Sequence, residues 1–228
     1  MEKAFWLNSW ELKGHYTNFH RNDIHPHLIK HLPPFALEGQ TIFVPFCGKS
    51  IDLLYFSRFA TRVIGVEISE KAIIQFFDEN HLAYRQIGSR FVSGNITILC
   101  RDFFWLNRED IGAIDIVYDR TAMTMLPHDM RMRYLQTLEW LTPVGTLYFL
   151  NTLEYSPLLS TPPFSISPDD VTRYFPNYVV DHIENISLAQ NGMIRHHALS
   201  EVKEHGFIMR KLYDSPVLID IDDLEVVA

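Results

Sequence analysis

Cysteine is scarce in this sequence, and the positions of its two cysteines do not suggest a structural role. Only Cys47 and Cys100 occur among 228 residues. Each follows a short apolar run typical of a strand, and the two do not show metal-ligand spacing. A disulfide framework and a zinc site are therefore not indicated, and a reducing compartment, the cytoplasm, is expected.

Long hydrophobic runs and an excess of positive charge are also missing. No apolar stretch approaches the length that spans a bilayer, and the N-terminus lacks a basic segment followed by an apolar one. The net charge is −8, which disfavours nucleic acid and anionic lipid because such a surface repels phosphate. We expect one domain that binds neither membrane nor nucleic acid, as a monomer, with a dimer left open.

Strands and helices alternate along most of the chain. Thr41–Val44 predicts a strand, Ile51–Phe59 a helix, and the run that ends at Glu67 a second strand, which together form a βαβ unit. Further helices are predicted over Glu70–Asn80, Asp129–Leu141 and Pro168–Phe175, and further strands over Ile96–Cys100, Ile114–Tyr118, Thr146–Leu153, Tyr178–Ile186 and Phe207–Tyr213. This alternation predicts an α/β fold.

Glycine is scarce in the turn after the first strand. That turn has only Gly48, where a dinucleotide fingerprint would have three glycines. Glu67 ends the second strand about 20 residues further on, where a carboxylate can accept hydrogen bonds from a ribose. A surface charge that precedes a helix capped by Ser69 explains the position equally well. A nicotinamide-dependent dehydrogenase is a rival that the missing glycines disfavour.

Two later strand ends bring polar residues toward the same crevice. Asp102 could accept a hydrogen bond from a purine amine while Phe103 stacks on the ring, although Asp102 could equally cap a turn. Arg120 could bind a carboxylate bidentately, or it could form a structural salt bridge with Asp119 or another acid. The residues alone leave both choices open.

Aromatic and histidine residues crowd the N-terminal segment. Trp6 and Trp10 are four residues apart, so a helix would put both indoles on one face, where they could pack on the core or cover a flat ligand. His25 and His27 suggest a metal site, but no cysteine or paired carboxylate lies near them in sequence, and we expect no metal. The segment is interpreted as a lid.

In order and spacing, a set of short motifs resembles the thiopurine S-methyltransferase family, whose members use S-adenosylmethionine. The motifs are Trp6-x-x-x-Trp10 with Phe19-His20, Pro45-Phe46-Cys47-Gly48-Lys49, Gly65-Val66-Glu67-Ile68-Ser69, Phe76-Phe77, Ser93-Gly94-Asn95-Ile96, Asp119-Arg120, Pro162-Pro163-Phe164 and Lys211-Leu212-Tyr213. The resemblance implies a Rossmann-like class I methyltransferase fold, with a mostly parallel sheet, helices on both faces and an antiparallel strand near the C-terminus. One domain would span 1–213, with its lid at about 1–32, before an acidic tail over 214–228.

The resemblance also implies roles for individual residues. Cofactor-binding residues would be Trp6, Trp10, Phe19, Pro45, Phe46, Cys47, Gly48, Glu67, Ile68, Asp102, Phe103, Asp119 and Arg120. Substrate-binding residues would be Phe19, Phe46, Phe164 and Arg195, and catalytic ones His20, Arg120 and Arg195. His20 would act as a general base, or would hold the lid by a backbone hydrogen bond.

The implied reaction is methyl transfer to a small, soft or heteroaromatic acceptor, with a thiol as the first expectation. Such a transfer is an in-line displacement in which the protein aligns the nucleophile and excludes water. N-methylation of a small heteroaromatic compound and noncatalytic binding of S-adenosylmethionine are the alternatives.

Overall fold

A single nine-stranded sheet organises the computed structural model, which describes residues 3–11, 23–189 and 192–214. The strands are β1 (Thr41–Val44), β2 (Arg62–Glu67), β3 (Arg85–Ile87), β4 (Arg90–Ser93), β5 (Ile96–Cys100), β6 (Ile116–Asp119), β7 (Leu147–Ser156), β8 (Tyr178–Ser187) and β9 (Glu201–Lys211). The helices are α1 (Lys3–Glu11), α2 (Pro26–His31), α3 (Pro34–Leu37), α4 (Asp52–Phe59), α5 (Glu70–Glu79), η1 (Phe103–Trp105), α6 (Arg108–Ile111), α7 (Ala122–Met125), α8 (His128–Leu141), α9 (Pro168–Tyr174) and α10 (Gly192–His197).

The strand order β3-β4-β5-β2-β1-β6-β7-β9-β8 places the parallel strands in the middle of the sheet. β1 pairs in parallel with both β2 and β6, and β5 and β7 extend the parallel part on either side. β4 is antiparallel to β5, and β9 is antiparallel to β7 and β8. The predicted class I fold, with its antiparallel strand near the C-terminus, is confirmed. Because the chain runs outward from β1 in both directions, a ligand crevice is expected beside its carboxyl end.

Two strands extend beyond their predicted bounds, because they pair with each other. β7 and β9 are matched from Leu147 opposite Arg210 to Ser156 opposite Glu201. The prediction began the last strand at Phe207, since residues 201–206 are mostly polar. Continuous backbone pairing to β7 keeps this polar half in the sheet.

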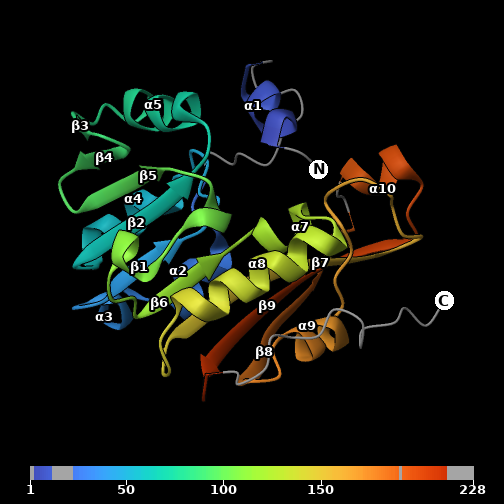
Figure 1. Cartoon of the computed structure of the whole chain (residues 1–228). Coiled ribbons are helices and arrows are strands. Elements are labelled where there is room, and N and C mark those ends of the chain that lie inside the picture. Colours follow the sequence, from blue (N-terminus) through green and yellow to red (C-terminus); the bar gives the residue numbers. More distant parts are fainter. Residues whose placement is uncertain (1–2, 12–22, 190–191, 215–228) are drawn as a thin grey trace.

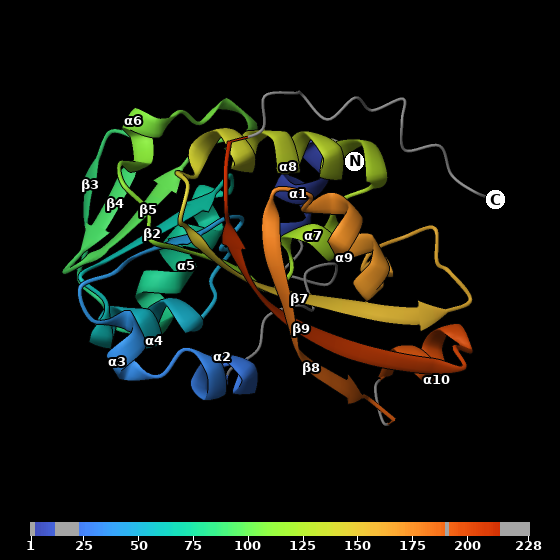
Figure 2. The same cartoon turned by 90° about the horizontal axis from the view of Figure 1, so that it is seen from below.

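Successive side chains of the central strands enter two separate cores, one on each face of the sheet. Phe43 and Val117 join a cluster that contains the apolar residues of α8 and α9. Ile42 and Tyr118 join a second cluster, with residues of α2, α4 and α5. Figure 2 shows these two helical layers on opposite sides of the sheet.

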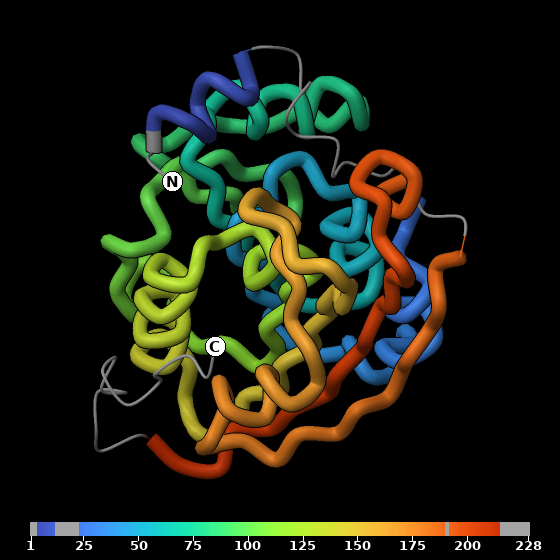
Figure 3. Tube along the Cα trace, turned by 90° about the vertical axis from the view of Figure 1, so that its right-hand side faces the viewer, coloured from blue at the N-terminus to red at the C-terminus, as the bar shows by residue number. Residues whose placement is uncertain are grey.

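The N-terminal helix α1 lies beside α5, apart from the layer formed by α2 and α3 (Figures 1 and 3). An ion pair between Glu11 and Lys71, with 2.8 Å between Oε2 and Nζ, joins α1 to α5. The helix predicted around Trp6 and Trp10 is present. Every helix in the described part of the chain is too short or too polar to cross a bilayer.

Candidate active site

A cavity of about 470 Å³ opens where β1, β2, β5 and β6 end. Its lining consists of Trp6, Trp10, Val44, Pro45, Phe46, Cys47, Gly48, Ser50, Val66, Glu67, Ile68, Arg101, Asp102, Phe103, Phe104, Tyr118, Arg120, Thr121, Ala122, Met125, Leu126, Asp129, Met130 and Arg133. The crevice thus collects residues from strand ends that are far apart in sequence.

The turn between β1 and α4 folds tightly against β2. Phe46 has a φ of +47° and Gly48 a φ of +51°, and the amide of Cys47 donates to the carbonyl of Val66 at 2.9 Å. A Cβ atom at Gly65 would lie 2.7 Å from the Sγ of Cys47. Glycine at position 65 therefore allows the turn to approach β2, and the left-handed residue at 46 turns an aromatic ring into the cavity.

Glu67 is a buried carboxylate at the edge of the cavity, with 6% of its surface exposed. It accepts hydrogen bonds from the amides of Gly48 at 3.1 Å and Ser69 at 2.8 Å. Burial raises the pKa of Glu67 to about 7, because these amides offset only part of the lost hydration. Ser69 also caps α5, as the alternative interpretation held. Glu67 itself is not a surface charge.

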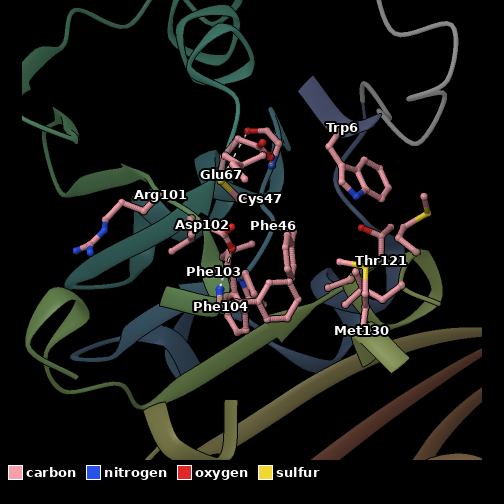
Figure 4. A pocket seen from close by; sticks show the side chains of 18 of the residues that line it. Trp6, Phe46, Cys47, Glu67, Arg101, Asp102, Phe103, Phe104, Thr121 and Met130 are labelled. Carbon is pink, nitrogen blue, oxygen red and sulfur yellow. Dashed lines mark hydrogen bonds between the residues drawn. The ribbon is translucent and has the colours of Figure 1, made fainter. Parts of the chain in front are cut away.

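Aromatic rings form the middle of the cavity (Figure 4). The ring centroid of Phe46 lies 5.0 Å from that of Phe103 and 6.1 Å from that of Phe104. Asp102 accepts a hydrogen bond from the amide of Phe104 at 3.1 Å, so it caps η1 and also lines the cavity. Arg101 extends away from the other side chains drawn and pairs with Asp110.

Arg120 lines the cavity and pairs with an acid that sequence reasoning did not name. Its Nη1 lies 2.8 Å from Oδ2 of Asp52, and its side chain is 15% exposed. The same carboxylate accepts hydrogen bonds from the hydroxyl of Tyr118 at 2.9 Å and the amide of His25 at 3.0 Å. Arg120 thus combines a structural ion pair with a place in the cavity.

Asp119, which was predicted for the cofactor site, does not line the cavity. It accepts hydrogen bonds from the amide of Ala122 at 2.8 Å and from the hydroxyls of Tyr134 at 2.7 Å and Tyr148 at 2.8 Å. Burial raises its pKa above the ordinary value. Asp119 therefore anchors the start of α7 against the core beneath the cavity.

The two residues predicted for the acceptor from the C-terminal half also lie outside the cavity. The ring of Phe164 packs on the guanidinium of Arg131, which lies 5.9 Å from the ring centroid. Arg195 is exposed on α10, whose Met193 and Ile194 pack against a small core beside β9. The sequence around Phe164 and Arg195 could not show this, because both positions depend on how β7 and β9 pair. Phe19 and His20 lie outside the described residues.

One wall of the cavity was missed by sequence reasoning. It comes from the segment after β6 and from the first turns of α8: Thr121, Ala122, Met125, Leu126, Asp129, Met130 and Arg133. The guanidinium of Arg133 lies 4.7 Å from the ring centroid of Phe104. The spacing of 129, 130 and 133 marks one face of a helix, but periodicity cannot tell a core face from a cavity face.

The histidines near the N-terminus meet a carboxylate that the sequence places far away. Ligand atoms of His25, His27 and Glu204 lie within 4.8 Å of one another. Nδ1 of His25 accepts a hydrogen bond from the amide of His27 at 3.2 Å, so Nε2 carries the proton and donates to Glu204 at 2.8 Å. This tautomer makes the cluster a hydrogen-bonded link between α2 and β9.

The parallel sheet, with a crevice at the carboxyl ends of its strands, is the class I methyltransferase fold. Among solved structures, a 1,6-didemethyltoxoflavin N1-methyltransferase from Burkholderia thailandensis, with S-adenosylhomocysteine bound, has a TM-score of 0.62 and 12% identity, over 92% of this chain and 87% of that one. TehB from Haemophilus influenzae has a TM-score of 0.59 and 12% identity, over 90% and 66%. At such identities the likeness concerns the fold.

The family is shown by sequence. The model of the family Thiopurine S-methyltransferase (TPMT) matches residues 1–211. Thiopurine S-methyltransferase of Pseudomonas putida is 36% identical, over 84% of this chain and 90% of the relative, and that of Xanthomonas axonopodis pv. citri is 38% identical, over 81% and 87%. The chain belongs to the thiopurine S-methyltransferase family and is an S-adenosylmethionine-dependent methyltransferase. The dehydrogenase alternative is thereby excluded.

Proposed function

We propose that this chain methylates the sulfur of a small aromatic or heteroaromatic thiol, as the names of its relatives suggest. The observation that carries the proposal is the composition of the cavity. One side offers hydrogen-bonding carboxylates and a guanidinium at strand ends, and the other offers indoles and thioethers. The first suits a nucleoside joined to an amino acid, and the second suits a flat, soft acceptor.

The residues at the strand ends fit S-adenosylmethionine. Glu67 has lone pairs beyond those that its backbone donors use, and these can accept from ribose hydroxyls. Asp102 can accept from the adenine amine beside the ring of Phe103, and Arg120 can donate to the methionine carboxylate. Pro45, Phe46, Cys47 and Gly48 would offer backbone groups and Phe46 its ring, while Ile68 would pack on the nucleoside.

The remaining cavity residues would place and desolvate the acceptor. S-adenosylmethionine held by the strand-end residues would supply an electrophilic methyl group on its sulfonium, for transfer to the acceptor sulfur with S-adenosylhomocysteine as the leaving group. Trp6 and Trp10 would exclude water, and the thioethers of Met125 and Met130 would contact a soft ring. Arg133 would favour the thiolate over the thiol by its charge.

The organisation of the chain is part of the proposal. We assign residues 1–213 to one methyltransferase domain, with about 1–32 as its lid and 214–228 as an acidic tail. Phe19 stays in this proposal as a cofactor- and substrate-binding residue, and His20 as a catalytic one. The net charge of −8 supports a protein that does not bind nucleic acid. We further propose that it is cytoplasmic and a monomer, with a dimer as the alternative.

Methyl transfer from labelled S-adenosylmethionine to a panel of thiols, selenols, halides and heteroaromatic amines tests the proposal. We expect product with aromatic thiols, and much less with the matched amines and with Glu67→Ala protein. Transfer to the amines alone would make the enzyme an N-methyltransferase. Binding of S-adenosylmethionine without transfer to any acceptor would support a noncatalytic protein instead.

A further inference from the structure

Asp52 is a fully buried carboxylate that does not line the cavity but hydrogen-bonds two residues that do, Tyr118 and Arg120. Its exposed fraction is 0%. Oδ1 accepts from the amide of His25 at 3.0 Å, and Oδ2 accepts from the hydroxyl of Tyr118 at 2.9 Å and from Nη1 of Arg120 at 2.8 Å. The hydroxyl of Ser50 lies 3.3 Å from Oδ2. With both oxygens engaged, the carboxylate cannot rotate.

The ion pair with Asp52 fixes the direction in which Arg120 presents its guanidinium. A guanidinium offers five N–H donors in a rigid plane, and fixing one end of that plane fixes the direction of the others. Asp52 holds Nη1, and within the described residues no second acid pairs with Arg120. Among the described residues, the guanidinium hydrogen-bonds only through Nη1, and Arg120 also lines the cavity, so its other N–H groups can donate to a carboxylate there.

We propose that Asp52 is a positioning residue for cofactor recognition: it orients Arg120 so that the guanidinium receives the methionine carboxylate of S-adenosylmethionine. The inference rests on the proposed function, because it assumes that the cofactor's carboxylate binds at Arg120. Breaking a buried ion pair leaves an unpaired charge, so loss of Asp52 should disturb the carboxylate end of the site and leave the nucleoside end intact.

Two ligands separate these ends of the site. S-adenosylhomocysteine carries the amino-acid carboxylate, whereas 5′-methylthioadenosine has the same nucleoside without it. For Asp52→Asn we expect about tenfold weaker binding of S-adenosylhomocysteine by calorimetry, and a change of less than about twofold for 5′-methylthioadenosine. Equal weakening of both ligands would show a merely structural role, and unchanged binding of both would remove Asp52 from recognition. Either result overturns the proposal.

Glu79→Gln is a matched control. Glu79 also forms an ion pair, with 2.7 Å between Oε1 and Nζ of Lys49, but neither residue lines the cavity. The same carboxylate-to-amide change should leave the affinity for both ligands unaltered. Failure of wild-type protein to bind S-adenosylhomocysteine at all would instead contradict the proposed function.

A double-mutant cycle tests whether Asp52 acts through Arg120. Arg120→Ala should weaken S-adenosylhomocysteine binding by more than Asp52→Asn does, and adding Asp52→Asn to it should have little further effect. Additive effects would show that Asp52 does not act through Arg120.

If Asp52→Asn does not fold, Tyr118→Phe removes one restraint on Oδ2 and keeps the ion pair. It should weaken S-adenosylhomocysteine by about threefold and 5′-methylthioadenosine less, and equal effects would count against the proposal.

Discussion

The two walls of the cavity are built in different ways. The wall that we assign to the cofactor, the cofactor wall, consists of Pro45, Phe46, Cys47, Gly48, Glu67, Ile68, Asp102, Phe103 and Arg120. The wall that we assign to the acceptor, the acceptor wall, consists of Trp6, Trp10, Thr121, Ala122, Met125, Leu126, Asp129, Met130 and Arg133. The first sits on strand ends that the sheet holds in register, and the second sits on helices and on an N-terminal segment.

The sheet fixes the positions of the residues on the cofactor wall more firmly than those of the residues on the acceptor wall. Glu67, Asp102 and Arg120 lie at the ends of strands that the hydrogen-bonded sheet holds in register, and each of the three also binds the backbone or another side chain. Helix α1 takes no part in that register, so a change in its sequence would leave the strand ends in place. Cofactor recognition should therefore respond to single polar changes, and acceptor turnover to changes in the covering helix.

Removal of α1, residues 3–11, should give the largest effect on turnover. Both indoles of the acceptor wall would be lost, and the acceptor would be less well aligned and more exposed to water. We expect methyl transfer to fall about 100-fold or more. S-adenosylhomocysteine affinity, measured by calorimetry, should change far less. If affinity and turnover fell together, α1 would belong to the cofactor site as well, as the family resemblance implies for Trp6 and Trp10.

Glu67→Ala should give the largest effect on cofactor affinity. Buried ribose hydroxyls would lose a charged partner, which corresponds to roughly 1–3 kcal/mol, while the fold is retained. Because Glu67 also holds the amides of Gly48 and Ser69, circular dichroism must accompany the calorimetry. Unchanged affinity in a folded variant would leave Glu67 with only its structural contacts.

The pH dependence of binding should be smaller and should come from the same residue. With a pKa of about 7, Glu67 is mostly protonated at pH 6 and ionised at pH 8. Only the ionised form accepts from both ribose hydroxyls, so S-adenosylhomocysteine affinity should rise about tenfold over that range. Glu67→Gln should flatten the profile. A profile that stays steep in this variant would assign the titration to another group.

Residues at strand ends were also the part of the site that could be predicted from the sequence. Glu67, Asp102 and Arg120 directly follow or end strands, and parallel strands bring their ends together. Local patterns could therefore predict a shared crevice for these residues, and all three line the cavity. Asp119 has the same local signal but points into the core, where Tyr134 and Tyr148 bind it. Adjacent residues of a strand face opposite sides, and the sequence did not show that Arg120 would line the cavity while Asp119 would not.

Partners from distant segments could not be predicted at all. Asp52 meets Arg120 across 68 positions, and Glu204 meets His25 across 179. Neither pair leaves a periodic pattern in the chain. That Phe164 and Arg195 lie outside the cavity could not be predicted for the same reason, since both positions depend on where the strands of the C-terminal half place their loops.

The smallest expected effects are those on the acceptor KM, which should differ between Met130→Ala and Phe164→Ala. Met130 lines the acceptor wall, so Met130→Ala should remove about 1 kcal/mol of apolar contact and raise the acceptor KM about fivefold, with S-adenosylhomocysteine affinity unchanged. Phe164 lies outside the cavity against Arg131, so Phe164→Ala should lower thermal stability and leave the acceptor KM within about twofold. Steady-state kinetics with one aromatic thiol and both variants measures this contrast. A large KM change for Phe164→Ala beside a normal KM for Met130→Ala would move the acceptor from the acceptor wall to the loop that carries Phe164.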